Sequence, residues 1–152
     1  MYSRHPARPF LHHAIGLAMI LLAATAFAGD LAQQTSESGG ITISVKPVDV
    51  SAGAASWSFK VSLDSLKQDL GDDLMHTAYV VNRASKKNEV PIAWKGDAAG
   101  GRHREGVLSF NAVKPTPTAI ELRIRRAGEK APRLFRWDLD CPCNDPKMHP
   151  SS

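Results

Sequence analysis

The sequence is constrained most by a strict alternation of apolar and polar residues in four short segments. The segments are ITISV (41–45), SWSFKVSL (56–63), TAIELRIR (118–125) and RLFRWDL (133–139). Successive side chains of a β-strand point to opposite faces of its sheet, so alternation of this kind predicts a strand with one buried face. We therefore expect four half-buried strands.

Three weaker strand candidates lie between these segments, at about 76–82, 89–95 and 106–110. Turn-rich joints separate them, and no long amphipathic helix is indicated. About seven short strands at this spacing predict an all-β fold, an antiparallel sandwich of immunoglobulin-like type. The exception is the segment 63–76, where leucines recur every four residues and indicate one or two helical turns between strands.

Ten side chains on the apolar strand faces are expected to form the core. They include all three tryptophans, because indole rings bury a large apolar area. The predicted core is Trp57, Phe59, Val61, Trp94, Leu108, Phe110, Leu122, Ile124, Phe135 and Trp137.

The first 28 residues resemble a secretory signal peptide. Arg4 and Arg8 precede an apolar run at 14–27, and Ala-Phe-Ala at 26–28 fits a cleavage motif. The run is shorter than the roughly 20 residues that span a bilayer. We expect cleavage, a periplasmic or extracellular location and no membrane anchor afterwards. Residues 29–40 have the composition of a flexible leader, which places the sandwich domain at 41–140 and a tail at 141–152.

The charge balance and the absent motifs restrict the function. Without the two arginines of the leader, 17 of the 19 basic residues remain against 15 acidic ones, an excess too small to indicate nucleic acid as a partner. The basic stretch 123–136 is expected to be a solvated sheet face. No hydrolase elbow, zinc-protease, phosphate-loop or Cys-x-x-Cys motif is present. We therefore predict a binding or structural module without catalysis or a required cofactor, with an unidentified protein or a metal ion as partner.

One segment carries a resemblance to other proteins. Its residues are Trp94, Gly96, Gly100, Gly101, His103, Arg104, Gly106, Leu108 and Phe110, and LDSLKQDLGDDL precedes them. They resemble a poorly characterised group of exported bacterial β-sandwich domains with the pattern Trp-x-Gly, Gly-Gly-His-His, Gly-x-Leu-x-Phe. This chain departs from the pattern at Arg102. The resemblance implies a fold and a compartment but no activity.

The same segment offers a candidate cation site. His103 follows two glycines that permit a tight turn, and an acidic loop upstream holds Asp69, Asp72 and Asp73. If the two loops share one end of the sandwich, these four side chains would form an oxygen-rich metal site. The alternative is that the aspartates cap a short helix and that His103 is a solvated hairpin residue.

The tail holds the only two cysteines of the chain. Cys141, Cys143, Met148 and His149 are two thiols, a thioether and an imidazole within nine residues, a donor set that favours Cu(I) and then Zn(II). Three alternatives remain: a strained disulfide between the two thiols, a cross-link between two chains in an oxidising compartment, and an inert tail. The alternative function is that of a small thiol–disulfide redox or disulfide-cross-linked protein. The metal and disulfide alternatives are favoured, because an exported protein does not keep exposed thiols reduced without a metal or a reductant.

Overall fold

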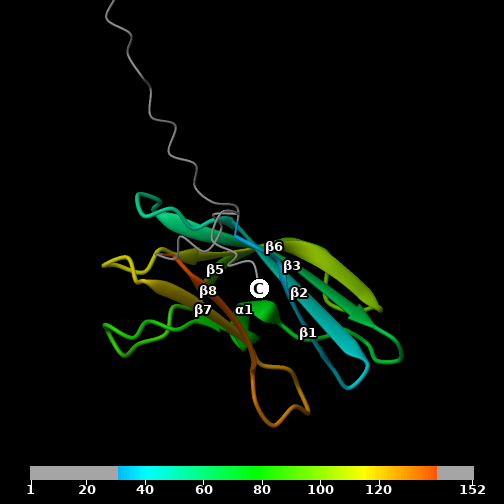
Figure 1. The fold of residues 1–152 in the computed structure, drawn as a ribbon. Helices are drawn as coiled ribbons and strands as arrows, with labels where there is room; N and C mark the ends of the chain where they lie inside the picture. Colours follow the sequence, from blue (N-terminus) through cyan, green and yellow to red (C-terminus); the bar gives the residue numbers. More distant parts are fainter. Residues whose placement is uncertain (1–30, 140–152) are drawn as a thin grey trace, which may run out of the picture.

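The computed structural model describes residues 31–139, which form eight strands and one short helix (Figure 1). The elements are β1 Gln34–Ser38, β2 Ile41–Asp49, β3 Ser56–Ser65, α1 Leu74–Thr77, β4 Ala78–Val80, β5 Pro91–Gly96, β6 His103–Asn111, β7 Ala119–Ile124 and β8 Arg133–Asp138. All neighbouring strands pair antiparallel. The expected all-β, antiparallel class is confirmed.

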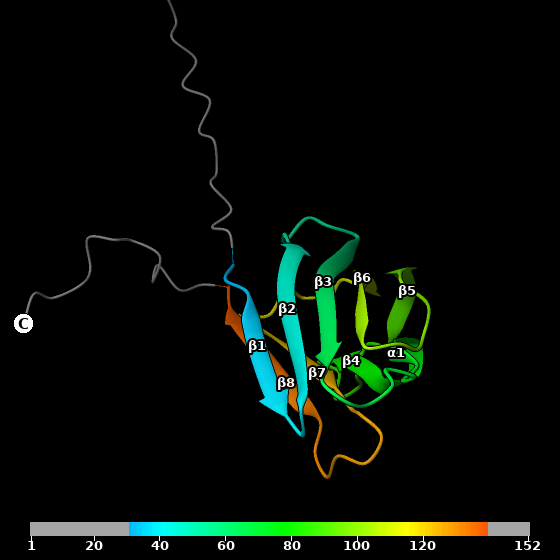
Figure 2. The ribbon, with the colours of Figure 1, turned by 90° about the vertical axis from the view of Figure 1, so that its right-hand side faces the viewer.

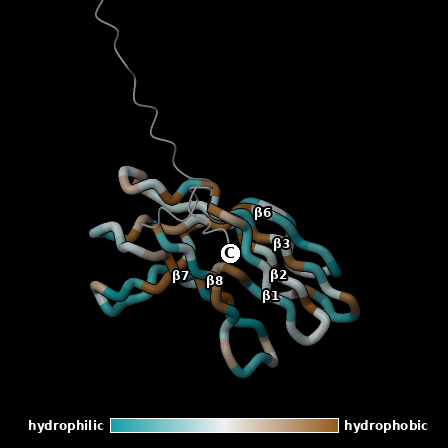
Figure 3. The backbone as a smooth tube through the Cα atoms, in the orientation of Figure 1, coloured by the Kyte–Doolittle hydropathy of each residue, from teal (hydrophilic) through white to brown (hydrophobic). Residues whose placement is uncertain are grey.

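The strands make two sheets that face each other. One has the order β1-β2-β3-β6-β5 and the other the order β4-β7-β8. Figure 2 shows the five-stranded sheet across the molecule, with β7 and β8 behind it. Figure 3 shows hydrophobic and hydrophilic residues alternating along the strands. This alternation gives each sheet one apolar face, and the two apolar faces meet in the core.

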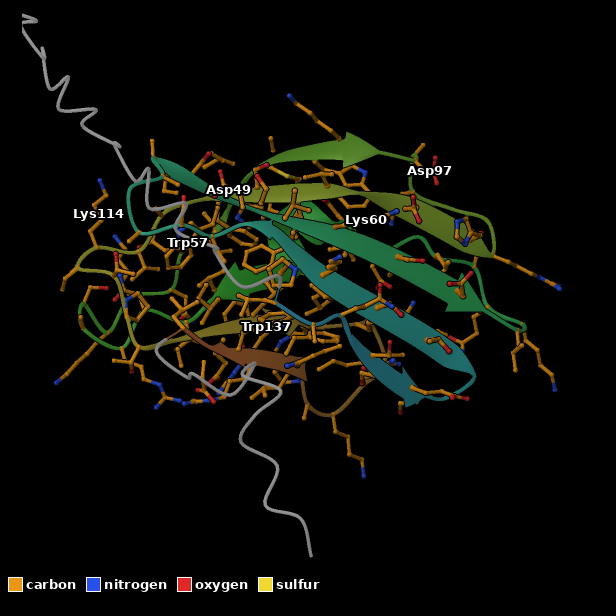
Figure 4. All side chains as sticks on the ribbon, turned by 45° about the horizontal axis from the view of Figure 1, so that its top comes forward. Asp49, Trp57, Lys60, Asp97, Lys114 and Trp137 are labelled. Atoms are coloured by element: carbon orange, nitrogen blue, oxygen red, sulfur yellow. The ribbon has the colours of Figure 1, made fainter. Side chains whose placement is uncertain are left out.

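The core lies between the sheets. Nine of the ten predicted core residues are buried, and the tenth, Trp94, is partly buried against the core. Phe59 is central, with its ring centroid 5.8 Å from those of both Phe110 and Trp137. Figure 4 shows Trp57 and Trp137 in the space between the sheets, whereas Lys60 and Asp97 lie outside it.

The prediction of a flexible leader at residues 29–40 is wrong for Gln34–Ser38, which form β1. The strand QTSES has no apolar face, and it is an edge strand, paired with β2 on one side only. Its turn is Gly39-Gly40, with positive φ angles of 59° and 75° that glycine adopts at little cost. Two glycines between two strands are a hairpin signal, and this signal was present in the sequence.

Side chains close the gap between β1 and β8, which belong to different sheets. The buried Arg133 of β8 donates hydrogen bonds to the carbonyl oxygens of Ser36, Ser38 and Ile41, at 2.8–2.9 Å. The amide of Gln34 donates to the carbonyl oxygen of Arg136 and accepts from its backbone N–H. Side-chain hydrogen bonds to backbone groups therefore fasten the N-terminal hairpin to the last strand.

The segment 63–76 contains one helical turn, at its end. Leu70 and Leu74 are buried, but Leu66 is 72% exposed in a bend after β3, so the four-residue spacing of the leucines does not mark one helix face. Within residues 31–139, no helix has the length and apolar character needed to cross a membrane.

Candidate functional site

The glycine turn and the acidic loop do lie at the same end of the molecule. The backbone N–H of Gly101 donates to Asp69 Oδ1 at 2.7 Å, and Leu70 exchanges backbone hydrogen bonds with Gly100 and Gly101. Gly100 and Gly101 have the positive φ angles expected of a tight turn, 117° and 72°. The condition on which the predicted cation site depended, that the two loops share one end of the sandwich, is therefore met.

The four residues of the predicted cation site nevertheless have separate partners. Asp72 accepts hydrogen bonds from Arg126 Nε at 2.7 Å and from the backbone N–H of Ala127 at 3.1 Å. Asp73 caps α1 by accepting from Met75 N at 2.9 Å, as in the capping alternative. The part of the chain that the structure describes contains no group of three or more His, Cys, Asp or Glu side chains arranged to hold a metal.

His103 pairs with a carboxylate that the sequence did not suggest. Its Nδ1 lies 2.6 Å from Oδ1 of Asp64, on the neighbouring strand β3. The hydrogen bond to Asp64, followed by the charge of that carboxylate, raises the pKa of His103 above its usual value of 6.5. Both side chains are 57% exposed, so this is a surface pair. Asp73 and His76 form a similar pair. The pKa of Asp73 is lowered by the hydrogen bond with His76 and then by the hydrogen bond from the backbone N–H of Met75.

The residues that carry the family resemblance have structural roles in β5 and β6. Gly96 and Gly106 are paired across the strands, and a Cβ on Gly96 would lie 2.3 Å from the carbonyl oxygen of Glu105. The ring of Trp94 covers Gly106 and lies 5.6 Å from the guanidinium of Arg104. The buried Arg104 donates to the carbonyl oxygens of Leu70 and Asp72, at 3.0 and 2.8 Å, and so holds the acidic loop against the sheet. A close strand approach and a fixed loop account for this motif.

The tail residues Cys141, Cys143, Met148 and His149 lie outside the described residues. The last described residue is Leu139, directly after β8. The structure therefore does not test the predicted copper site.

A cluster of charged side chains that the sequence analysis did not single out lies on the outer face of the three-stranded sheet. At its centre is Glu121 of β7, whose side chain is only 5% exposed. Arg83 NH2 is 2.9 Å from Oε2, Arg123 Nε is 2.6 Å from Oε1, and Arg136 NH1 is 3.9 Å from Oε2. Three arginines from a loop and two strands thus surround one buried carboxylate.

The electrostatics of the cluster keep Glu121 ionised. Burial tends to raise the pKa of Glu121, but the hydrogen bonds from Arg83 and Arg123 outweigh this effect, and the pKa is lowered overall. The hydrogen bond to Glu121, and then that to Tyr79, raises the pKa of Arg123. The carboxylate therefore holds the surrounding guanidinium groups in place.

A cleft of about 320 Å³ opens over this cluster. Residues 81–84, Val113 and residues 115–119 line it, together with Glu121 and Arg136. The prediction of a solvated face for 123–136 missed the cluster. The sequence did contain one signal for this cluster: Glu121 and Arg123 occupy alternate positions of one strand and so share a face of the sheet.

Comparison with known proteins adds no relative to these observations. No family model, no curated protein and no solved structure matches the chain. The resemblance to exported sandwich domains therefore stays a prediction.

Proposed function

We propose that this protein is an exported, immunoglobulin-like binding module without catalytic activity, which handles copper through its C-terminal tail. The observation that supports the immunoglobulin-like part of this proposal is the strand order. Apart from β1, the sheets read β2-β3-β6-β5 and β4-β7-β8. In chain order, these seven strands take the places of A-B-E-D and C-F-G in a constant-type immunoglobulin domain, with β1 as an additional edge strand.

The sequence markers of antibody domains are missing from this arrangement. The B–F disulfide of those domains has no counterpart, because β3 and β7 contain no cysteine, and β4, in the place of strand C, lacks the tryptophan. Many other sandwich families share the architecture without these markers. The immunoglobulin-like proposal is thus supported by topology and not by sequence markers.

Export is proposed from the signal-peptide pattern of residues 1–28, and the tail is the reason to propose copper. Fold alone does not name a ligand, so the ligand follows from the available donors. We propose that the thiolates of Cys141 and Cys143 are the primary donors, with Met148 or His149 completing a three-coordinate Cu(I) site. Cu(I) is d¹⁰ and prefers soft sulfur donors, so two thiolates separated by one residue chelate it without a preformed cavity. Zn(II) is the second choice.

The sandwich should not depend on this metal. A core between two sheets is formed by residues up to Leu139, and all four proposed donors follow that residue in the sequence. Copper binding is therefore expected to leave the unfolding temperature of the domain unchanged. A zinc-finger-like site would instead couple metal binding to folding.

Competition with a chromophoric Cu(I) chelator tests the proposal. The reduced protein should retain one equivalent of Cu(I), and the variant Cys141→Ser/Cys143→Ser should lose it while unfolding at the same temperature. Equal retention by the two proteins would remove the copper function.

The alternative function is thiol–disulfide exchange or cross-linking through Cys141 and Cys143, suggested by two thiols in an exported chain. Titration of thiols in protein purified anaerobically without reductant separates the two functions. Copper handling requires free thiols that the metal protects. Redox use requires a disulfide that forms and breaks reversibly at the potential of periplasmic partners.

A further inference from the structure

We propose that the cleft over Glu121 binds a small oxyanion, a carboxylate or phosphate group, between Arg83 and Arg136. This site is independent of the tail. It lies on the outer face of β4-β7-β8, and it comes from contacts between elements that are far apart in the sequence. The proposal rests on the charge of the cluster, on the way the arginines are held and on the cleft beside them.

The cluster carries more positive charge than its own carboxylate neutralises. Arg83, Arg123 and Arg136 surround Glu121, and Arg136 Nη2 also lies 3.4 Å from Asp138, which is 61% exposed. Beside the cleft, Glu89 accepts a hydrogen bond from Asn82 at 3.3 Å. Three guanidinium groups thus pair with two carboxylates, Glu121 and Asp138. The remaining positive charge lies over a partly enclosed surface, where an anion is attracted more strongly than in bulk water.

Arg83 supplies the donors for such an anion. Among its contacts with described residues, one nitrogen bonds to Glu121, and the side chain remains 71% exposed. A guanidinium has five N–H donors in a rigid fork, so Arg83 retains donors for a planar pair of oxygens. Arg136 of β8 is 48% exposed and lines the same cleft.

The arginines are held before any ligand arrives. Glu121 is fixed on the central strand of its sheet and paired in register with Arg136, and its pKa is lowered, so its charge persists at neutral pH. Ordering a long side chain on binding costs about 0.5–1.5 kcal/mol, and a buried carboxylate that already holds the guanidinium reduces that cost. This is the arrangement by which positioned arginines recognise oxyanions.

The walls of the cleft suit a small, polar guest. Thr116 and Thr118, which alternate with Pro115 and Pro117, line the cleft, and their hydroxyl groups can donate to an anion. Lys114 precedes this stretch, and Figure 4 shows it on a loop at one end of the molecule. A volume of about 320 Å³ is at the lower end of the range for small-molecule sites, so it fits a compact acid and not a long chain.

Titration with citrate and with inorganic phosphate, followed by amide chemical shifts, tests the site and distinguishes the two oxyanion classes. The background should be Cys141→Ser/Cys143→Ser, so that the tail takes no part. Saturable shifts should appear at residues 81–84 and 113–119 with at least one of the anions. Arg83→Gln should weaken binding by about tenfold or more, the loss expected for one charge-assisted hydrogen-bond pair.

Two further variants separate a built site from general attraction. Arg102→Gln removes the same charge at an exposed position in the glycine turn and should leave the affinity within about twofold. Arg83→Lys keeps the charge but loses the fork, and it should weaken binding about as much as Arg83→Gln. An unchanged amide spectrum elsewhere establishes that each variant is folded. The proposal is overturned if neither anion shifts the cleft residues, if Arg102→Gln weakens binding as much as Arg83→Gln, or if Arg83→Lys binds like the parent protein.

Discussion

Replacement of Arg133 by methionine should destabilise the fold more than any other change of a single charged side chain discussed for this domain. Arg133 is 4% exposed. Its guanidinium donates to three backbone carbonyls of the β1–β2 hairpin and to both carboxylate oxygens of Glu129. All five N–H donors are therefore engaged. Methionine fills a similar apolar volume but makes none of these hydrogen bonds, and it leaves Glu129 without this charge partner.

The magnitude follows from what remains after the change. Removing one partner of a buried ion pair costs about 3–5 kcal/mol, because the other charge is left unpaired. Each lost hydrogen bond to a backbone carbonyl adds about 0.5–1.5 kcal/mol. Glu129 is 21% exposed and Ser38 lies beside the solvent-exposed glycine turn, so water relieves part of this cost. We expect a net loss of about 3–5 kcal/mol, a third or more of the stability of a typical domain.

Urea denaturation followed by tryptophan fluorescence measures this loss. Arg125→Met is the matched control, because Arg125 is exposed just after β7, and its change should stay within about 0.5 kcal/mol. Arg133→Lys keeps the charge but cannot reach five acceptors, so most of the loss should remain. A loss below about 1 kcal/mol in Arg133→Met would refute the role of this arginine in joining β1–β2 to β8.

Three other predictions test local features. Gly96→Ala should lower the unfolding free energy by about 2–3 kcal/mol, because the added Cβ would meet backbone atoms of β6. Gly53→Ala is the control: no atom lies within 4 Å of its added Cβ, so it should cost less than about 0.5 kcal/mol. Thermal unfolding of the two variants measures the difference. Because the pKa of Glu121 is lowered in the fold, the ionised carboxylate contributes to stability above pH 4.5, and this contribution is lost as the pH falls through the folded pKa. The difference in unfolding free energy between the protein and Glu121→Gln should therefore shrink on acidification. Because the pKa of His103 is raised, the His103–Asp64 pair contributes fully to stability below pH 6.5, and this contribution is lost as the pH rises through the folded pKa. NMR titration of His103 should give a midpoint above 6.5, and the midpoint should fall in Asp64→Asn. The same midpoint in the protein and in Asp64→Asn would contradict the pairing.

Strands with one buried face were predictable from the sequence, because burial of one face imposes alternation. The segments 41–45, 56–63, 118–125 and 133–139 all fall on strands β2, β3, β7 and β8. The structure extends β2 to Asp49, beyond the predicted segment. The weaker candidates also mark real strands, although β4 is only three residues long and begins after α1.

Features that depend on several elements at once were not predictable. The polar edge strand β1 has no hydrophobic pattern, so the Gly39-Gly40 turn was the one sequence signal for it, and its attachment to Arg133 of β8 had none. Similarly, Glu121 reads as an ordinary solvent-facing residue of an alternating strand. Glu121 is buried because the side chains of Arg83 and Arg136 cover it, and strand pairing brings these side chains to it. His103 was assigned to the wrong aspartates because register, and not sequence distance, selects Asp64.

X-ray absorption at the copper edge of the reduced protein, loaded with one equivalent of Cu(I), tests the proposed function most directly. The spectrum reports the identity and the number of atoms bound to the metal. We predict two thiolate sulfurs, from Cys141 and Cys143, and one further sulfur or nitrogen from Met148 or His149. A first shell made only of nitrogen and oxygen, or the same spectrum from Cys141→Ser/Cys143→Ser, would contradict copper handling by the tail.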